Sequence, residues 1–123
     1  PNSITFNAAI SACEKGKQWQ WALEMLCDMR QQQVAPDVIS YNAALSSCEK
    51  SGHWLKALSL LCDMRLRRVA SDAISYNAAI SACAKRGHWI WALVQLREMR
   101  EQHVLPNRVT YNAAISACEK GKQ

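Results

Sequence analysis

The sequence repeats itself every 35 residues, and this period constrains the fold more than any other feature. The stretch TFNAA starts at Thr5, SYNAA starts at Ser40 and again at Ser75, and TYNAA starts at Thr110. A fixed period of about 20 to 50 residues is typical of stacked repeat architectures. The chain therefore holds three whole units, residues 3–37, 38–72 and 73–107, and a partial fourth unit, residues 108–123, with its first helix only. Further columns keep the same step: Lys15, Lys50, Lys85 and Lys120; Trp19, Trp54 and Trp89; Met29, Met64 and Met99.

Each unit carries the apolar pattern of two helices. In the second unit one stripe runs from Tyr41 to Cys48 at i, i+3, i+4 and i+7, and another begins at Trp54. No alternation typical of β-strands remains. The sequence predicts an all-α protein, a right-handed superhelical α-solenoid of antiparallel helix pairs. The apolar side of the half unit at the end needs either more chain or another protein to cover it.

The starts of the first helices carry a second expectation. A Ser or Thr precedes each aromatic residue there, and hydroxyl side chains are favoured at helix N-caps. We expect these residues to cap the first helices: Ser40, Ser75 and Thr110.

Composition limits the function classes. Lys and Arg total 15 against 10 Asp and Glu, giving a net charge of +5 and making an anionic partner such as nucleic acid plausible. No apolar run approaches the roughly 18 residues of a membrane-spanning helix, so we expect no membrane insertion. The chain does not begin with Met, so the lack of a targeting peptide says nothing about destination.

The six cysteines follow the repeat as well. One column holds Cys13, Cys48, Cys83 and Cys118, and the other holds Cys27, Cys62 and then Arg97. A disulfide framework that loses a partner in one unit is a poor framework, and no Cys-x-x-Cys pair suggests zinc. We expect buried, reduced thiols that act as small apolar residues.

The units VISYNAALSSCEKSGHWLKALSLLCDMRLRRVASD and AISYNAAISACAKRGHWIWALVQLREMREQHVLPN resemble the pentatricopeptide repeat family. The Tyr-Asn pair, the Ala-Leu of the second helix, the following Met and the Pro-Asp or Pro-Asn junction fall at the family's spacing. The resemblance covers essentially the whole chain. One departure concerns the end of the second helix, where the family usually has Gly and this chain has Gln33, Arg68 and His103.

The resemblance implies single-stranded RNA binding, with one base per repeat read by two or three side chains. The residues that match the family's base-reading positions form three pairs and one single: Asn7 with Asp37, Asn42 with Asp72, Asn77 with Asn107, and Asn112. By the family's code, Asn with Asp favours uracil, and Asn with Asn favours cytosine with tolerance for uracil. The expected target is 5′-U-U-C-3′, with U tolerated third. The resemblance also implies base-sandwiching by Ile4, Ile39, Ile74 and Val109, and phosphate contacts by Lys15, Lys50, Lys85 and Lys120.

Structural alternatives stand beside these roles. The recurring asparagines form an Asn column: Asn7, Asn42, Asn77 and Asn112. They could cap helices locally, although Asn in a helix costs roughly 0.5 kcal/mol or more relative to Ala. The Lys column lies near helix C-termini, where the helix dipole favours any cation. Five tryptophans could stack on bases, but their place on the second helices favours packing between helices: Trp19, Trp21, Trp54, Trp89 and Trp91.

No catalytic or cofactor pattern accompanies the repeats. His53 and His88 have no acidic or thiol partner at useful spacing, and no phosphate-cradling Gly loop appears. We expect no enzyme activity, no cofactor, no metal and no small-molecule substrate. Two functions follow: RNA binding in organellar RNA processing, stability or translation, or a protein–protein scaffold that docks as a subunit of a large organellar assembly. Localisation to a mitochondrion or plastid is implied by the family resemblance alone.

Overall fold

The computed structural model describes residues 3–15 and 18–121, which form seven α-helices and no β-strand. The helices alternate between the first and second helix of each unit. Their bounds are α1 Ser3–Lys15, α2 Trp19–Gln31, α3 Val38–Ser51, α4 Trp54–Leu66, α5 Ala73–Lys85, α6 Trp89–Glu101 and α7 Arg108–Lys120. None of these helices is long and apolar enough to cross a bilayer.

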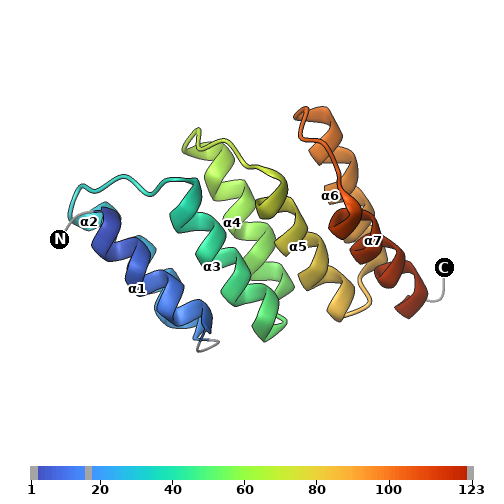
Figure 1. The fold of residues 1–123 in the computed structure, drawn as a ribbon, viewed down its shortest axis with the longest axis horizontal. Coiled ribbons are helices and arrows are strands. Elements are labelled where there is room, and N and C mark those ends of the chain that lie inside the picture. The colour runs from blue at the N-terminus through green and yellow to red at the C-terminus, as the bar shows by residue number, and fades with distance from the viewer. Residues whose placement is uncertain (1–2, 16–17, 122–123) are drawn as a thin grey trace.

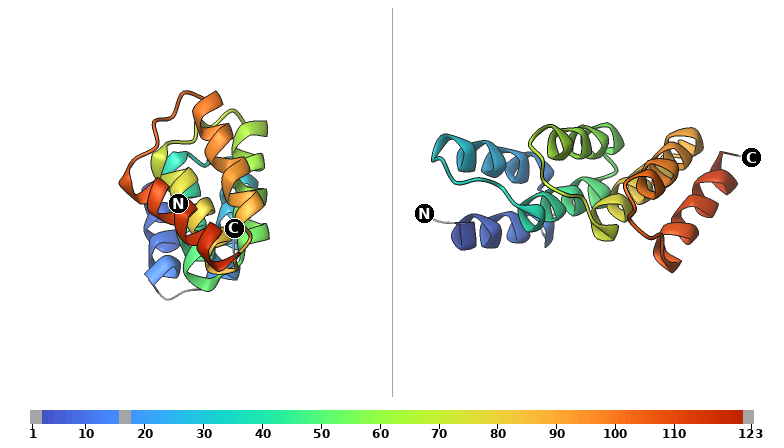
Figure 2. Two further views of the ribbon diagram at one scale, coloured as in Figure 1. Left: turned by 90° about the vertical axis from the view of Figure 1, so that its right-hand side faces the viewer. Right: turned by 90° about the horizontal axis from the view of Figure 1, so that it is seen from above.

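The helices stack in two rows, and the solenoid runs from one end of the chain to the other (Figure 1). Helices α1, α3, α5 and α7 pack on one another in order and form the first row. Helices α2, α4 and α6 form the second row, which the view from above separates clearly from the first (Figure 2). The predicted all-α solenoid of antiparallel helix pairs is confirmed.

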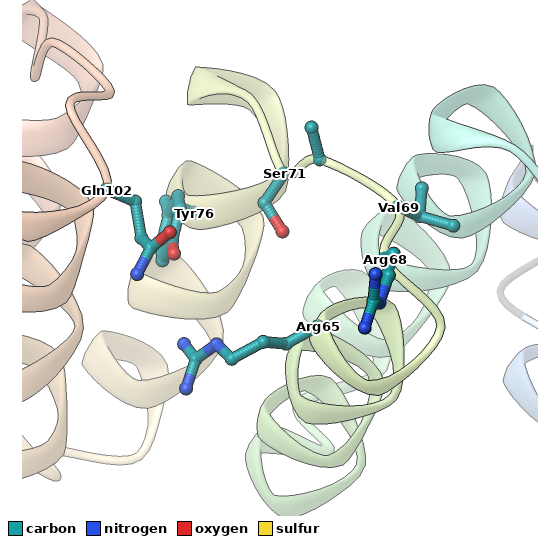
Figure 3. A pocket seen from close by; sticks show the side chains of 7 residues that line it. Arg65, Arg68, Val69, Ser71, Tyr76 and Gln102 are labelled. Carbon is teal, nitrogen blue, oxygen red and sulfur yellow. The ribbon is translucent and has the colours of Figure 1, made fainter.

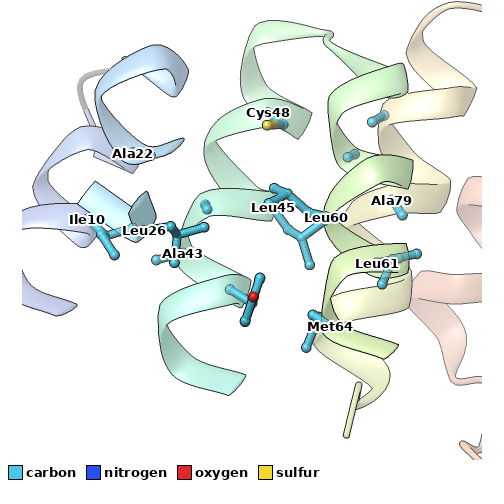
Figure 4. Close-up of a cluster of buried hydrophobic side chains, with 14 of the residues drawn as sticks. Ile10, Ala22, Leu26, Ala43, Leu45, Cys48, Leu60, Leu61, Met64 and Ala79 are labelled. Atoms are coloured by element: carbon cyan, nitrogen blue, oxygen red, sulfur yellow. The ribbon is translucent and has the colours of Figure 1, made fainter. Parts of the chain in front are cut away.

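The core lies between the two rows. Leu26 of α2, Leu45 of α3 and Leu61 of α4 belong to one buried cluster, and Figure 4 shows Leu45 meeting Leu60 at its centre. A second cluster around Ile80 and Ala92 continues the core toward α7. Each helix pair thus buries its apolar stripe against the next pair, as expected for a stack in which single units cannot bury their own faces.

The cysteine prediction is only partly right. Cys48 and Cys83 are buried in the core, and burial raises the pKa of each thiol to about 11. Cys27 and Cys62 are exposed on α2 and α4, so for this column the prediction of buried thiols is wrong. The physical reason is that within the described residues no third row of helices covers the outer face of the second row.

The tryptophan prediction divides in the same way. Trp19 stacks on His53 and Trp54 on His88, each with ring centroids 4.0 Å apart, and these contacts join consecutive units. Trp21 and Trp91 are instead 55% and 47% exposed. For these two residues the prediction of packing between helices is wrong, because they point outward from the second row.

The first helices are capped by a different residue from the one expected. Asp37, Asp72 and Asn107 are the N-caps of α3, α5 and α7, and Ser40, Ser75 and Thr110 occupy the third helical position. The N-cap side chain accepts from the third residue's backbone N–H, and the hydroxyl accepts from the N-cap N–H. This reciprocal arrangement is a capping box. The prediction that the Ser and Thr residues are the caps is therefore wrong.

The second helices end in a left-handed residue despite the missing glycine. Gln33, Arg68 and His103 have φ angles of 60°, 60° and 61°. The left-handed conformation closes the helix by exposing its last carbonyls to the following N–H groups, as Val69 N to Met64 O at 2.8 Å illustrates. The junction geometry is thus kept at a conformational cost that Gly would not carry.

A polar latch between units was missing from the sequence-based expectations. Arg30 of α2 forms an ion pair with Asp63 of α4 and donates to the hydroxyl of Tyr41 at 2.9 Å. The Tyr41 hydroxyl in turn donates to Asp63 at 2.7 Å. The next units repeat parts of the latch, with Arg65 paired to Glu98. The partners lie 11 to 33 residues apart, so only the stacking of units brings them together.

Candidate nucleic-acid interface

The Asn column lies near the N-termini of the first-row helices and is hydrogen-bonded to the next unit. In the second unit, Asn42 Nδ2 donates to Asp72 Oδ1 at 3.1 Å. Asn42 Oδ1 accepts from the Ser75 hydroxyl at 2.5 Å. Asn42, Asp72 and Ser75 therefore form one hydrogen-bonded group, in which the two residues assigned to base reading touch each other directly.

The same group recurs in the flanking units. Ser40 donates to Asn7 Oδ1 at 2.5 Å, beside the N-cap Asp37. In the third unit Thr110 donates to Asn77 Oδ1, and Asn77 Nδ2 donates to Asn107 Oδ1 at 3.2 Å. Asn112 is exposed, and no hydrogen bond to its side chain is seen among the described residues. The three predicted pairs are thus brought together by the fold, one at each junction between units.

The hydrogen bonds within each group leave specific atoms for a ligand. Asp72 Oδ1 accepts from Ser75 N at 3.0 Å and from Asn42 Nδ2 at 3.1 Å, and the Ile74 backbone N–H also donates to the Asp72 carboxylate. A carboxylate has about four lone-pair sites, so Asp72 keeps capacity to accept from a ligand. An amide nitrogen carries two protons, so Asn42 keeps one N–H. The second group therefore offers one donor and one acceptor.

The third group offers a different pattern. Asn107 Oδ1 accepts from Thr110 N at 3.2 Å because it caps α7, which turns the Asn107 NH2 outward. Asn77 keeps its second N–H, as Asn42 does. This group offers donors only. The capping geometry thereby converts an Asp-to-Asn difference into a change from acceptor to donor at the same place.

Two carboxylates in these groups are held in the charged form. Partial burial pushes the pKa of Asp72 upward, but hydrogen bonds from the Ser75 backbone N–H and the Asn42 amide outweigh it and lower the pKa. Burial likewise acts against the ionised form of Asp37, and hydrogen bonds from Ser40 and Asn7 overcome it to lower its pKa. Both carboxylates are therefore acceptors at neutral pH.

The apolar column lies beside the Asn column on the same helix face. Residues three apart are neighbours on a helix, and each apolar residue precedes an Asn by three. These side chains are 56% to 76% exposed: Ile4, Ile39, Ile74 and Val109. Exposed β-branched side chains next to amides form an open surface of alternating apolar and polar character, which suits the flat faces and polar edges of unstacked bases.

The Lys column lies at the opposite ends of the first helices. Lys50 is eight residues beyond Asn42, which corresponds to about 12 Å along the helix axis. Lys85 pairs with Glu49 of the preceding first helix at 2.7 Å and donates to the Glu49 carbonyl at 3.0 Å. The Lys85 contact stabilises the C-terminus of α3, which is the structural role that the dipole argument describes.

A cationic pocket at the junction of the second and third units was not predicted. Arg65, Arg68, Ser71, Tyr76 and Gln102 line it, and Figure 3 shows the Arg65 side chain extending toward α5. Arg68 is exposed and forms no ion pair within the described part of the chain. Ser71 directly precedes the N-cap Asp72, so this positive charge lies at the same end of the first row as the Asn column. In the described ranges no three His, Cys, Asp or Glu side chains gather as a metal site.

The sequence matches a model described as PPR repeat family over residues 1–50, 36–85 and 71–120. No curated protein sequence matches the chain.

Solved structures with the same architecture include complexes with RNA. PPR10 in complex with an 18-nt psaJ RNA element is 27% identical, with a TM-score of 0.85 over 97% of this chain and 18% of that one. PPR10 from maize is 23% identical, with a TM-score of 0.87 over 99% and 18%. The PPR domain of Arabidopsis thaliana protein-only RNase P 1 in complex with tRNA is 14% identical, with a TM-score of 0.85 over 98% and 64%. The chain thus spans about a fifth of the length of PPR10.

Proposed function

Because this chain belongs to the pentatricopeptide repeat family, we propose that it binds single-stranded RNA along its first row of helices, one base at each junction. The observation that carries the proposal is the threefold recurrence of one group, an Asn in contact with the N-cap of the next unit. The RNA-bound PPR10 structure, similar over 97% of this chain, supports the same partner class.

The unused donors and acceptors support a pyrimidine order. In the first two groups one amide N–H and one carboxylate oxygen complement uracil, which offers a carbonyl acceptor and the N3–H donor. In the third group the donors of Asn77 and Asn107 complement cytosine, whose N3 and O2 are both acceptors. The proposed target is 5′-U-U-C-3′, with U tolerated at the third position because its carbonyls still accept from Asn.

Contacts outside the base edges complete the proposed interface. The exposed column from Ile4 to Val109 lies against the faces of the bases. Lys15, Lys50 and Lys120, at the far ends of the first helices, and Arg68 at the cationic pocket supply positive charge for phosphates. Such contacts release counterions, so binding weakens steeply as salt increases.

The experiment is an NMR titration of the chain with 5′-UUC-3′ and 5′-AAA-3′ trinucleotides at two salt concentrations. We expect saturable shifts of the Asn7, Asn42 and Asn77 side-chain amides with UUC, weaker shifts with AAA, and weaker binding at the higher salt. Equal affinities for the two trinucleotides would refute base reading. The exposed Ser59→Ala variant is the matched control, since Ser59 lies on α4 in the other row.

The wider role that we propose is non-catalytic and organellar, in RNA processing, stability or translation. Family membership is its support. Imaging of the intact protein fused to a fluorescent reporter tests the location, and cleavage assays on bound RNA test the absence of catalysis.

A second candidate is a docking subunit, favoured by exposed apolar side chains on the second row. Trp21, Ile90, Trp91 and Val94 are all more than a third exposed. Leu93, Tyr111 and Ile115 line a groove between α6 and α7. Co-purification with a large assembly that survives nuclease treatment would favour this role, and release by nuclease would favour RNA binding.

A further inference from the structure

The buried hydroxyl at the third position of each first helix faces two acceptors. Ser75 is fully buried, and its oxygen accepts from Asp72 N at 3.1 Å. Its single O–H lies 2.5 Å from Asn42 Oδ1 and 3.0 Å from Asp72 Oδ1. The shorter contact identifies Asn42 as the acceptor of the proton. The capping box therefore has a branch that leaves its own helix and reaches the preceding unit.

This branch determines how the Asn amide is oriented. The Asn42 amide is held at two points, Oδ1 by Ser75 and Nδ2 by Asp72. Rotating the amide by 180° would set its oxygen against the ionised Asp72 oxygen and repel it. Two anchors fix the amide plane, whereas a single anchor would leave a pivot.

Resting on the proposed function, we propose that Ser40, Ser75 and Thr110 are positioning residues for base selection. Each hydroxyl fixes the preceding unit's Asn so that its remaining N–H points to the base. The third unit supports this assignment because Thr110, which keeps the hydroxyl and adds a methyl group, makes the same contact to Asn77. The shared element is the hydroxyl rather than the side-chain size.

A purely structural role makes a different prediction. Loss of the hydroxyl also removes the acceptor for Asp72 N, so some loss of stability is expected under both roles. A structural defect at one junction would weaken binding to every RNA by the same factor. A positioning defect would change selectivity only at the nucleotide read by that junction.

The test compares Ser75→Ala, Ser75→Thr and the control Ser59→Ala by NMR titration with 5′-UUC-3′, 5′-UCC-3′ and 5′-UUA-3′. We expect Ser75→Ala to reduce the preference for UUC over UCC by about fivefold, the worth of one hydrogen bond. The preference for UUC over UUA should be unchanged, and Ser75→Thr should restore the wild-type ratio. The Asn42 side-chain amide signals should also change in Ser75→Ala without RNA.

The outcomes separate the two proposals. If the wild type prefers UUC over UCC and Ser75→Ala keeps that ratio, the positioning role is overturned and base reading stands. If Ser75→Ala lowers both ratios equally, its effect is not confined to the nucleotide read by that junction, and the positioning role is again overturned. If the wild type itself shows no preference, both proposals fail, and the wild-type measurement identifies that case.

Discussion

Exchanging Asp72 for Asn should recode the second junction without refolding it. Asn107 already occupies the equivalent N-cap, and its Oδ1 accepts from Thr110 N at 3.2 Å, against 3.0 Å for Asp72 and Ser75 N. Asn and Asp are about equal as N-caps, so we expect the free energy of unfolding to change little. What changes is the outward atom, which becomes an N–H donor in place of a carboxylate acceptor.

The magnitude follows from the kind of hydrogen bond that is lost. A hydrogen bond to a charged group is worth about 1.5 to 3 kcal/mol. Asp72 is more than a third exposed, and solvent screening places this bond at the lower end. About 1.4 kcal/mol is a factor of ten. We therefore expect the ratio of affinities for 5′-UUC-3′ and 5′-UCC-3′ to shift toward UCC by about tenfold in Asp72→Asn.

The reciprocal variant Asn107→Asp is the matched control. It should shift the third position from C toward U by a similar factor and leave the second position unchanged. Removing a negative charge strengthens binding to every RNA, so the ratio of affinities reports selectivity and a single affinity does not. Competition between the trinucleotides at one fixed salt concentration measures these ratios. The reasoning is refuted if Asp72→Asn keeps the wild-type ratio of affinities while its melting temperature equals that of the wild type.

Two further predictions concern stability. Arg68→Gly should raise the free energy of unfolding by up to about 1 kcal/mol, because Arg68 has a φ of 60° that favours Gly. Arg67→Gly, where φ is −96°, should lower the free energy of unfolding. Denaturant unfolding measures both variants, and a change of the same sign in both would contradict this reasoning. The depressed pKa values of Asp37 and Asp72 mean that their stabilisation is complete above their unfolded-state pKa of about 4 and is lost as the pH falls through the lower folded-state values. Melting temperatures of wild type and an Asp37→Asn, Asp72→Asn double variant between pH 6 and 2.5 test this, with a flatter acid limb expected for the variant.

Much of the fold was readable from the sequence because its signals are local. The period of 35 residues and the apolar spacing of about 3.6 residues predicted paired helices, and the helices found match that pattern. Local rules also explain why the ends of the second helices keep their geometry without a glycine. A chain that must close each second helix adopts the left-handed conformation at Gln33 and Arg68 even without Gly.

The features that the sequence did not predict depend on which neighbouring helix covers a side chain. Cys27 follows the period as faithfully as Cys48, yet one is exposed and the other buried. The column alone does not show that, in the described chain, the second row lacks an outer layer. The Arg30, Tyr41 and Asp63 latch joins three helices and carries no local pattern of its own.

The sequence by itself determined the repeat, its helices, and the Asn and Asp columns that are candidates for reading bases. Only the tertiary structure decided what those columns do within the protein. Stacking brings Asn42 to residues 30 and 33 positions further along the chain, where Asp72 caps a helix and Ser75 donates its buried proton. Hydrogen bonds require contact within about 3 Å, and periodicity specifies the order of residues but not their distances.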